Sequence, residues 1–189
     1  MQPTIEFFGD EYEVPEGFIA VRTRAVRNAE NFNLDFFPLD EMQKAASTYE
    51  GCGNVFVDHT YKLSRDNNQY EDGIDRSRSR GYVMAQRVEG DTQWLLIAIS
   101  KEWPKLVDAI LSGQVNGVSM GCDCTTWCPI CDTEFVAGSP CECGACPTRV
   151  GDFIHGQKVH EVLKDIKYYE ISIVFDPAEC TALFEEVVA

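Results

Sequence analysis

The sequence has few basic residues, only three histidines and no long apolar run. Its 189 residues include 16 lysines and arginines against 31 aspartates and glutamates, so the formal net charge is −15 at neutral pH. A surface this acidic repels nucleic acid and anionic lipid. We therefore expect no direct nucleic-acid partner, and we expect protein partners or substrates, basic ones among them. The 44% of hydrophobic and 25% of charged residues are typical of a single globular domain, here residues 1–189.

Signals for a membrane or for export are missing as well. The longest unbroken apolar run, Trp94–Ile99, is too short to cross a bilayer. The N-terminal residues carry acidic side chains where a secretory signal needs basic ones followed by an apolar stretch. We expect an intracellular protein with no membrane partner. Thiols stay reduced in that setting, so clustered cysteines predict a metal before disulfides.

Cysteines are concentrated in one stretch: seven of the nine lie between Cys122 and Cys146. Two Cys-x-x-Cys pairs about a dozen residues apart match the ligand spacing of a structural zinc site. Four thiolates would close the metal shell and leave no position for a catalytic water. We expect a zinc-binding insertion over residues 122–154; reduced cysteines without metal are the alternative. The predicted ligands are Cys128, Cys131, Cys143 and Cys146, with Cys122, Cys124 and Cys141 as alternates.

A serine, a histidine and a glutamate form the candidate catalytic set. Ser119 lies between Gly117 and Gly121, and a serine nucleophile needs a base and a third group that orients the base. His59 follows the apolar run Val55–Val57 and is the candidate base, because metal ligation competes for the histidines near the cysteines, His155 and His160. Glu170 is the candidate third group. Its rivals are Asp58, Asp152 and Asp165; we disfavour Asp58 because it would point away from its neighbour His59 in an extended segment.

Patterning predicts a mixed α+β fold. Apolar alternation and β-branched residues predict strands, and apolar residues at helical spacing predict helices. A serine in Gly-x-Ser-x-Gly also suits an α/β-hydrolase, but that fold needs a strand before the serine and a helix after it, whereas here a helix precedes and cysteines follow. Strands are expected at 16–26, 55–57, 81–88, 92–100 and 168–175, helices at 39–49 and 103–111, a short amphipathic segment at 159–167, a helix or tail at 181–188, and an exposed loop at 61–79.

Three segments in order resemble the prohead (capsid maturation) proteases of tailed bacteriophages, closest to the T-even-type branch. They are Val57-Asp58-His59, the run 110–121 ending in Val-Ser-Met-Gly, and the run 169–178 that begins Tyr-Glu-Ile-Ser. Those enzymes share the herpesvirus assemblin fold. The resemblance implies a mostly antiparallel β-barrel core surrounded by helices, with the cysteine-rich insertion added.

The same resemblance implies the function and the residue roles. Ser119 would be the nucleophile, His59 the base and Glu170 the third group of a serine endopeptidase. It would cleave phage scaffold and major capsid proteins, and itself, after an acidic residue, inside the assembling prohead in the host cytoplasm. An active homodimer is also implied. Assemblins place an arginine pair near the oxyanion, where this chain has Phe175-Asp176-Pro177, so backbone N–H groups near Ser119 or a water remain as donors.

Two other classes stay open. One is a catalytically inactive, zinc-stabilised scaffold or adaptor protein of head assembly. The other is a zinc metallohydrolase that uses cysteines with His155 or His160, disfavoured because the chain has no His-Glu-x-x-His helix and because four thiolates saturate a zinc ion.

Overall fold

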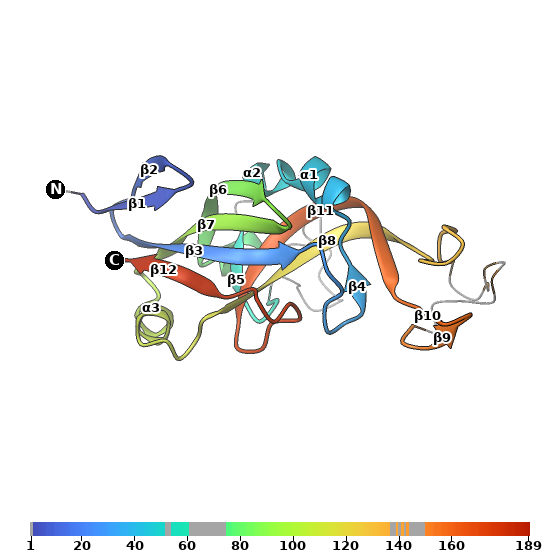
Figure 1. Ribbon diagram of the computed structural model, residues 1–189. Coiled ribbons are helices and arrows are strands. Elements are labelled where there is room, and N and C mark those ends of the chain that lie inside the picture. The colour runs from blue at the N-terminus through green and yellow to red at the C-terminus, as the bar shows by residue number, and fades with distance from the viewer. Residues whose placement is uncertain are drawn as a thin grey trace.

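The computed structural model describes residues 2–51, 54–60, 75–136, 139, 141, 143 and 150–189. It is a mixed α+β fold made mostly of strands, in which one large sheet curls into a half-barrel (Figure 1). The strands of this sheet follow the order β12 (Phe184–Val188), β3 (Phe18–Arg27), β7 (Thr92–Ser100), β6 (Gly81–Glu89), β5 (Val55–Val57), β11 (Glu161–Val174) and β4 (Asp35–Phe36), and β8 (Gly117–Trp127) also pairs with β11.

The remaining elements lie around this sheet. Two small hairpins are β1 (Thr4–Phe7) with β2 (Asp10–Glu13), and β9 (Phe153–Ile154) with β10 (Gln157–Lys158). The helices are α1 (Leu39–Ala45), α2 (Thr48–Gly51) and α3 (Pro104–Leu111), and Arg76–Arg78 forms one 3-10 turn. In the part of the chain that the structure describes, no helix combines the length and apolarity that a membrane crossing requires.

The sheet is mostly antiparallel, but β4 and β5 run parallel to β11. Its two ends approach each other where the start of β8 meets the segment before β12. An isolated bridge joins Gly117 to Leu183, and the amide of Val118 donates to the carbonyl of Ala182 at 2.9 Å. The strand that carries Ser119 is thus fixed by β11 on one side and by the C-terminal segment on the other.

Strand β7 explains the long apolar run of the sequence. Every residue from Leu95 to Ile99 is fully buried. Alternate side chains enter two clusters: Leu95, Ile97 and Ile99 join the main core, and Leu96 packs under the β1–β2 hairpin. A strand covered on both faces reads as a continuous apolar run rather than an alternating one.

Most predicted elements are confirmed. Strands at β3, β5, β6 and β7 and a helix at α3 match the predicted ranges to within a few residues, and the helix expected at 39–49 appears as α1 followed by α2. The prediction of a helix or tail at 181–188 is wrong in part, because Phe184–Val188 forms a strand. The loop expected at 61–79 falls mostly outside the described residues, which resume at Asp75.

The segments 159–167 and 168–175, predicted as separate elements, form the single strand β11. Its pairing with β8 shifts register between Lys164 and Lys167 and again between Tyr168 and Glu170, and Asp165 has a φ of 54°. Such bulges break the two-residue alternation of a strand, which is why the pattern did not read as one.

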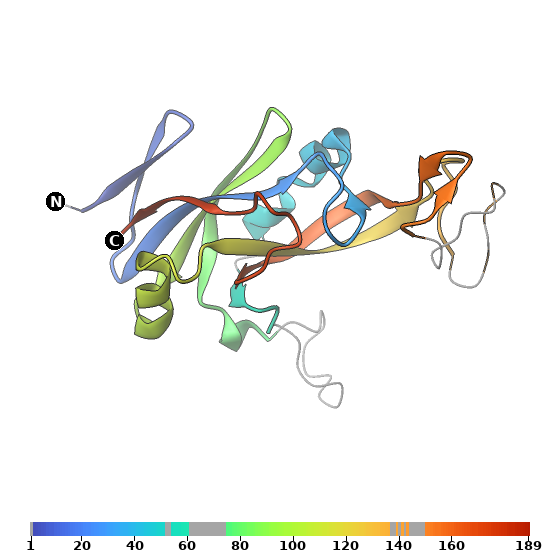
Figure 2. The ribbon, with the colours of Figure 1, turned by 60° about the horizontal axis from the view of Figure 1, so that its bottom comes forward.

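Strands β8 and β11 form a long ribbon that extends away from the rest of the sheet, with the cysteine-rich segment and β9–β10 at its far end (Figure 2). Residues 122–127 of the predicted insertion belong to β8, so its loops begin at Cys128. A small separate core stabilises this end, formed by Cys128, Phe135, Ile154 and Val159.

Candidate functional site

Three neighbouring strands position the candidate catalytic residues. On β11, Glu170 and Ser172 are two residues apart and therefore share a face of the strand. Across the β8–β11 pair, Ser119 is the register partner of Ser172, and Gly121 that of Glu170. On the other side of β11, the parallel strand β5 ends at Val57 and leads directly to His59. The strand pairing thus brings the segments of His59, Ser119 and Glu170 to neighbouring strands, although the sequence separates them widely.

His59 and Glu170 form a direct contact. The ring Nδ1 lies 2.9 Å from the carboxylate Oε1. A carboxylate only accepts hydrogen bonds, so Nδ1 is the donor and Nε2 is the nitrogen that can take up a proton. The Glu170 side chain is fully buried, whereas 42% of the His59 side chain is exposed. The carboxylate therefore orients the imidazole from the buried side, while the rest of the ring remains accessible to solvent.

Ser172 completes this arrangement and was not predicted. Its hydroxyl donates to Oε2 of Glu170 at 2.6 Å and accepts from the backbone amide of His59 at 3.1 Å. Both carboxylate oxygens of Glu170 thus have a partner, as a buried carboxylate requires. The signal for Ser172 was present in the sequence, because a residue two positions after Glu170 on a strand must lie on the same face.

A tight turn brings His59 to this position. Asp58 and His59 have φ angles of 48° and 54°, in the left-handed region. The turn is closed by hydrogen bonds from the Asp58 amide to the Ile173 carbonyl and from the Thr60 amide to the Val57 carbonyl, both at 3.1 Å. The segment is therefore not extended, so our reason for setting Asp58 aside was wrong, and Asp58 lines the same cavity as His59.

Ser119 and His59 line one open cavity of about 490 Å³. Its other walls come from the loop before β4 and from the residues that follow β11. Ser119 also borders a smaller cavity with Asn31, Asn33 and Asp35. No sequence pattern pointed to the loop before β4. The remaining lining residues of the large cavity are Phe32, Asn33, Asp58, Val174, Phe175, Asp176, Pro177 and Ala178.

Other candidates lie elsewhere. Asp165 is at the β11 bulge, where its amide donates to Glu41 at 2.8 Å. His160 contacts Glu30 at 3.4 Å and packs against Phe36. His155 is in the turn between β9 and β10. Asp152 precedes β9 and does not line the cavity of Ser119.

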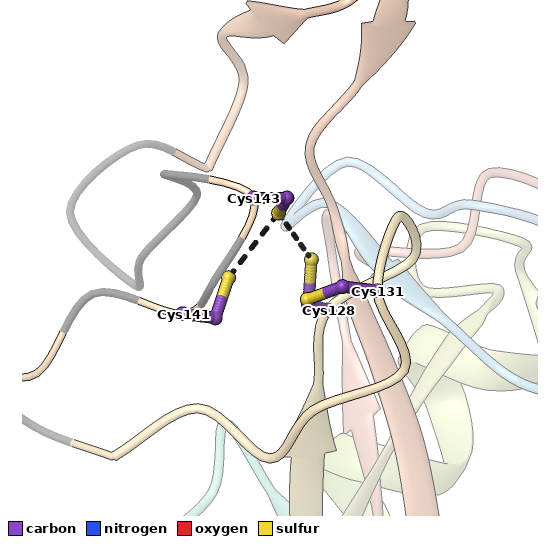
Figure 3. A group of neighbouring side chains, drawn as sticks. All are labelled: Cys128, Cys131, Cys141 and Cys143. Atoms are coloured by element: carbon purple, nitrogen blue, oxygen red, sulfur yellow. Dashed lines mark hydrogen bonds between the residues drawn. The ribbon is translucent and has the colours of Figure 1, made fainter.

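Four cysteines gather at the far end of the β8–β11 ribbon. The sulfurs of Cys128, Cys131, Cys141 and Cys143 all lie within 4.8 Å of one another (Figure 3). Cys143 is 3.6 Å from Cys128 and 3.3 Å from Cys141. Three of them were predicted ligands and Cys141 was an alternate; the fourth predicted ligand, Cys146, lies outside the described residues. Cys122 and Cys124 lie on β8 and are not members of this group.

The cluster has the chemistry of a metal site. A tetrahedral zinc–thiolate centre separates its sulfurs by about 3.8 Å, close to the observed spacings. Hydrogen bonding to the Thr133 hydroxyl lowers the pKa of Cys131 to about 6. Burial and the neighbouring thiols raise the pKa of Cys141 to about 12. Thiols crowded this closely cannot all ionise without a cation, so the donor set is compatible with structural zinc.

Comparison of the chain with protein-family models, with curated proteins and with solved structures found no match. The assignment of function therefore depends on the geometry of the site and on the sequence motifs.

Proposed function

We propose that this protein is a serine endopeptidase with Ser119 as nucleophile, His59 as general base and Glu170 as the group that orients the base. One observation carries the proposal: His59 contacts the buried carboxylate of Glu170 and lines the same cavity as Ser119. A serine, an accessible imidazole and a buried acid in this order are the parts of a hydrolytic triad, which is recognised by geometry and not by fold.

The chemistry follows from these roles. The Ser119 hydroxyl attacks the peptide carbonyl while its proton passes to Nε2 of His59. Glu170 stabilises the resulting imidazolium through the Nδ1 contact. The imidazolium then protonates the departing amine, which leaves an ester on Ser119. A water molecule, deprotonated by the same Nε2, hydrolyses the ester and restores the serine.

The biological setting follows from the resemblance of the three segments to phage prohead proteases. The substrates would be the scaffold and major capsid proteins and the chain itself, cleaved inside the assembling prohead in the host cytoplasm by a monomer or homodimer of herpesvirus-protease-like fold. The curled, mostly antiparallel sheet is consistent with that fold. In this proposal zinc holds the four-cysteine cluster and has a structural role, because four thiolates leave it no open position.

Co-expression with a candidate scaffold protein tests the proposal. We expect cleavage by the unaltered chain and by Ser112→Ala, an exposed serine that does not line the cavity, and no cleavage by Ser119→Ala. Cleavage that persists in Ser119→Ala would reject the serine mechanism. Failure of every version, including the unaltered chain, would favour the inactive scaffold or adaptor protein.

A further inference from the structure

Two phenylalanines line the cavity of Ser119 and His59 and are nevertheless largely exposed. The exposed fraction is 74% for Phe32 and 69% for Phe175. A single exposed apolar residue needs no explanation, but two large ones at one cavity with convergent polar groups are typical of a ligand site. They offer an apolar surface that nothing in the described chain covers.

The backbone that carries the two rings is well fixed. Phe32 lies in the loop before β4, where its amide donates to the carbonyl of Ala178 at 2.9 Å. The side chain of Asn31 holds the same loop by accepting from the amides of Asn33 and Asp35 at 2.9 and 3.0 Å. Phe175 directly follows β11. Rings on a fixed backbone can bind a partner with little additional loss of entropy.

The cavity is also lined by negative charge. Of the described residues that line it, the charged ones apart from the titratable His59 are Asp58 and Asp176, and both are exposed. A carboxylate brought into the cavity would meet like charge, whereas a lysine or arginine would meet opposite charge. The net charge of −15 would also attract basic segments during encounter.

We propose that this cavity binds a peptide segment in which a large apolar side chain neighbours a basic one. The apolar side chain packs against Phe32 and Phe175, and the basic group pairs with Asp58 and Asp176. Cleavage of such a segment rests on the proposed function, whereas its binding to the cavity does not depend on catalysis. The basic residue differs from the acidic residue that the resemblance implies, because the described walls supply no lysine or arginine to pair with an acidic one.

Binding to the 189-residue chain carrying Ser119→Ala tests the inference. The probes are three labelled synthetic peptides of equal length that carry leucine followed by lysine, glutamine or glutamate, and the readout is fluorescence anisotropy. We expect the lysine peptide to bind most tightly and the glutamate peptide most weakly. Phe32→Ala and Phe175→Ala should each raise the Kd of the lysine peptide about tenfold, because much of one bound apolar side chain would lose its cover. Asp176→Asn should reduce the difference between lysine and glutamate peptides.

Matched controls separate the cavity from general surface effects. Phe153 has the same 69% exposure but belongs to the β9–β10 hairpin, and Asp10 is exposed on β2; Phe153→Ala and Asp10→Asn should change nothing. Equal binding of the three peptides, tightest binding of the glutamate peptide, or equal loss in Phe153→Ala would overturn the inference.

Cleavage by the active chain is measured separately, so the two proposals can fail independently. Peptides that bind with the expected preference but are never cut would reject the endopeptidase and keep the binding site. Ser119-dependent cleavage that prefers the glutamate peptide would reject the binding preference and keep the endopeptidase.

Discussion

Gly121 and Glu170 are cross-strand partners, and the Glu170 side chain occupies the space that any side chain at position 121 would need. A Cβ atom placed on Gly121 would lie 2.9 Å from Cγ of Glu170 and closer still to its Oε1. It would also lie 2.7 Å from Cε2 of Tyr169. The second glycine of the Gly-x-Ser-x-Gly motif therefore makes room for the buried acid and is not there to form a turn.

Gly121→Ala should displace Glu170 from His59 and slow cleavage about a hundredfold, the effect of misplacing a catalytic group. The measurement is kcat on a peptide substrate, together with a thermal melt to confirm folding. Glu170→Asp, which shortens the acid, should also lose activity when made alone. Combined with Gly121→Ala it should cost less than the sum of the two, because the shorter acid relieves the clash. Strict additivity would contradict the steric account.

Ser172→Ala removes one donor to Glu170 and one acceptor for the His59 amide. Because both partners are buried or partly buried, we expect a loss of unfolding free energy of about 1–3 kcal/mol. We also expect kcat to fall while KM stays within about twofold, since the hydroxyl orients the base and does not contact substrate.

Ser100→Ala is the comparison for Ser172→Ala. Its hydroxyl also accepts one backbone amide, that of Glu102 at 3.2 Å, but it lies outside the cavity. That variant should keep full kcat. A KM effect in Ser172→Ala as large as its kcat effect would show that position 172 acts on substrate binding instead.

The parts of this site that could be predicted are those that local sequence determines. Val55–Val57 reads as a strand that ends before His59, and the run around Glu170 reads as a strand because of its β-branched and aromatic residues. The long-range strand pairings could not be predicted from local sequence. That β5 runs parallel to β11 beside Glu170, and that Ser119 pairs with Ser172, depends on the register of strands more than 50 residues apart.

The cavity walls are the part of the site that the sequence predicted least. Phe32 lines the cavity of Ser119, and its amide bonds to the carbonyl of Ala178, a contact between segments that share no pattern. Likewise, Cys-x-x-Cys spacing pointed to Cys128 and Cys131, which do lie in the four-cysteine group, but the place of Cys141 beside them depends on how the intervening loop returns.

Asp35 and Glu161 make the folded state sensitive to pH. They are partners across the β4–β11 pairing, and burial raises the pKa of both carboxyls above the ordinary values of 3.8 and 4.5. A pKa that is higher in the folded than in the unfolded state stabilises below the unfolded pKa, and this contribution is lost as pH rises through the folded pKa. The pair should therefore destabilise the fold at neutral pH.

Glu161→Gln should accordingly raise the midpoint of urea unfolding at neutral pH. This gain should shrink as the pH falls through the raised pKa of Glu161 in the folded state, and it should be absent below the ordinary value of 4.5 for glutamate. Urea titrations at several pH values measure it. Glu13→Gln, on the exposed strand β2, should show no such trend. A gain for Glu161→Gln that is constant with pH would contradict the electrostatic cause.

Metal binding by the cysteine cluster should depend on Cys141 and not on Cys180. Cys141 lies among the four gathered sulfurs, whereas Cys180 is exposed and outside the group. We expect one zinc ion per chain for the unaltered protein and for Cys180→Ser, measured by elemental analysis after dialysis. Cys141→Ser should lose most of the metal and lower the melting temperature, because the thiolate-bound ion holds a loop with only a small core of its own. Full zinc content in Cys141→Ser with loss in Cys146→Ser would instead assign the fourth ligand to position 146.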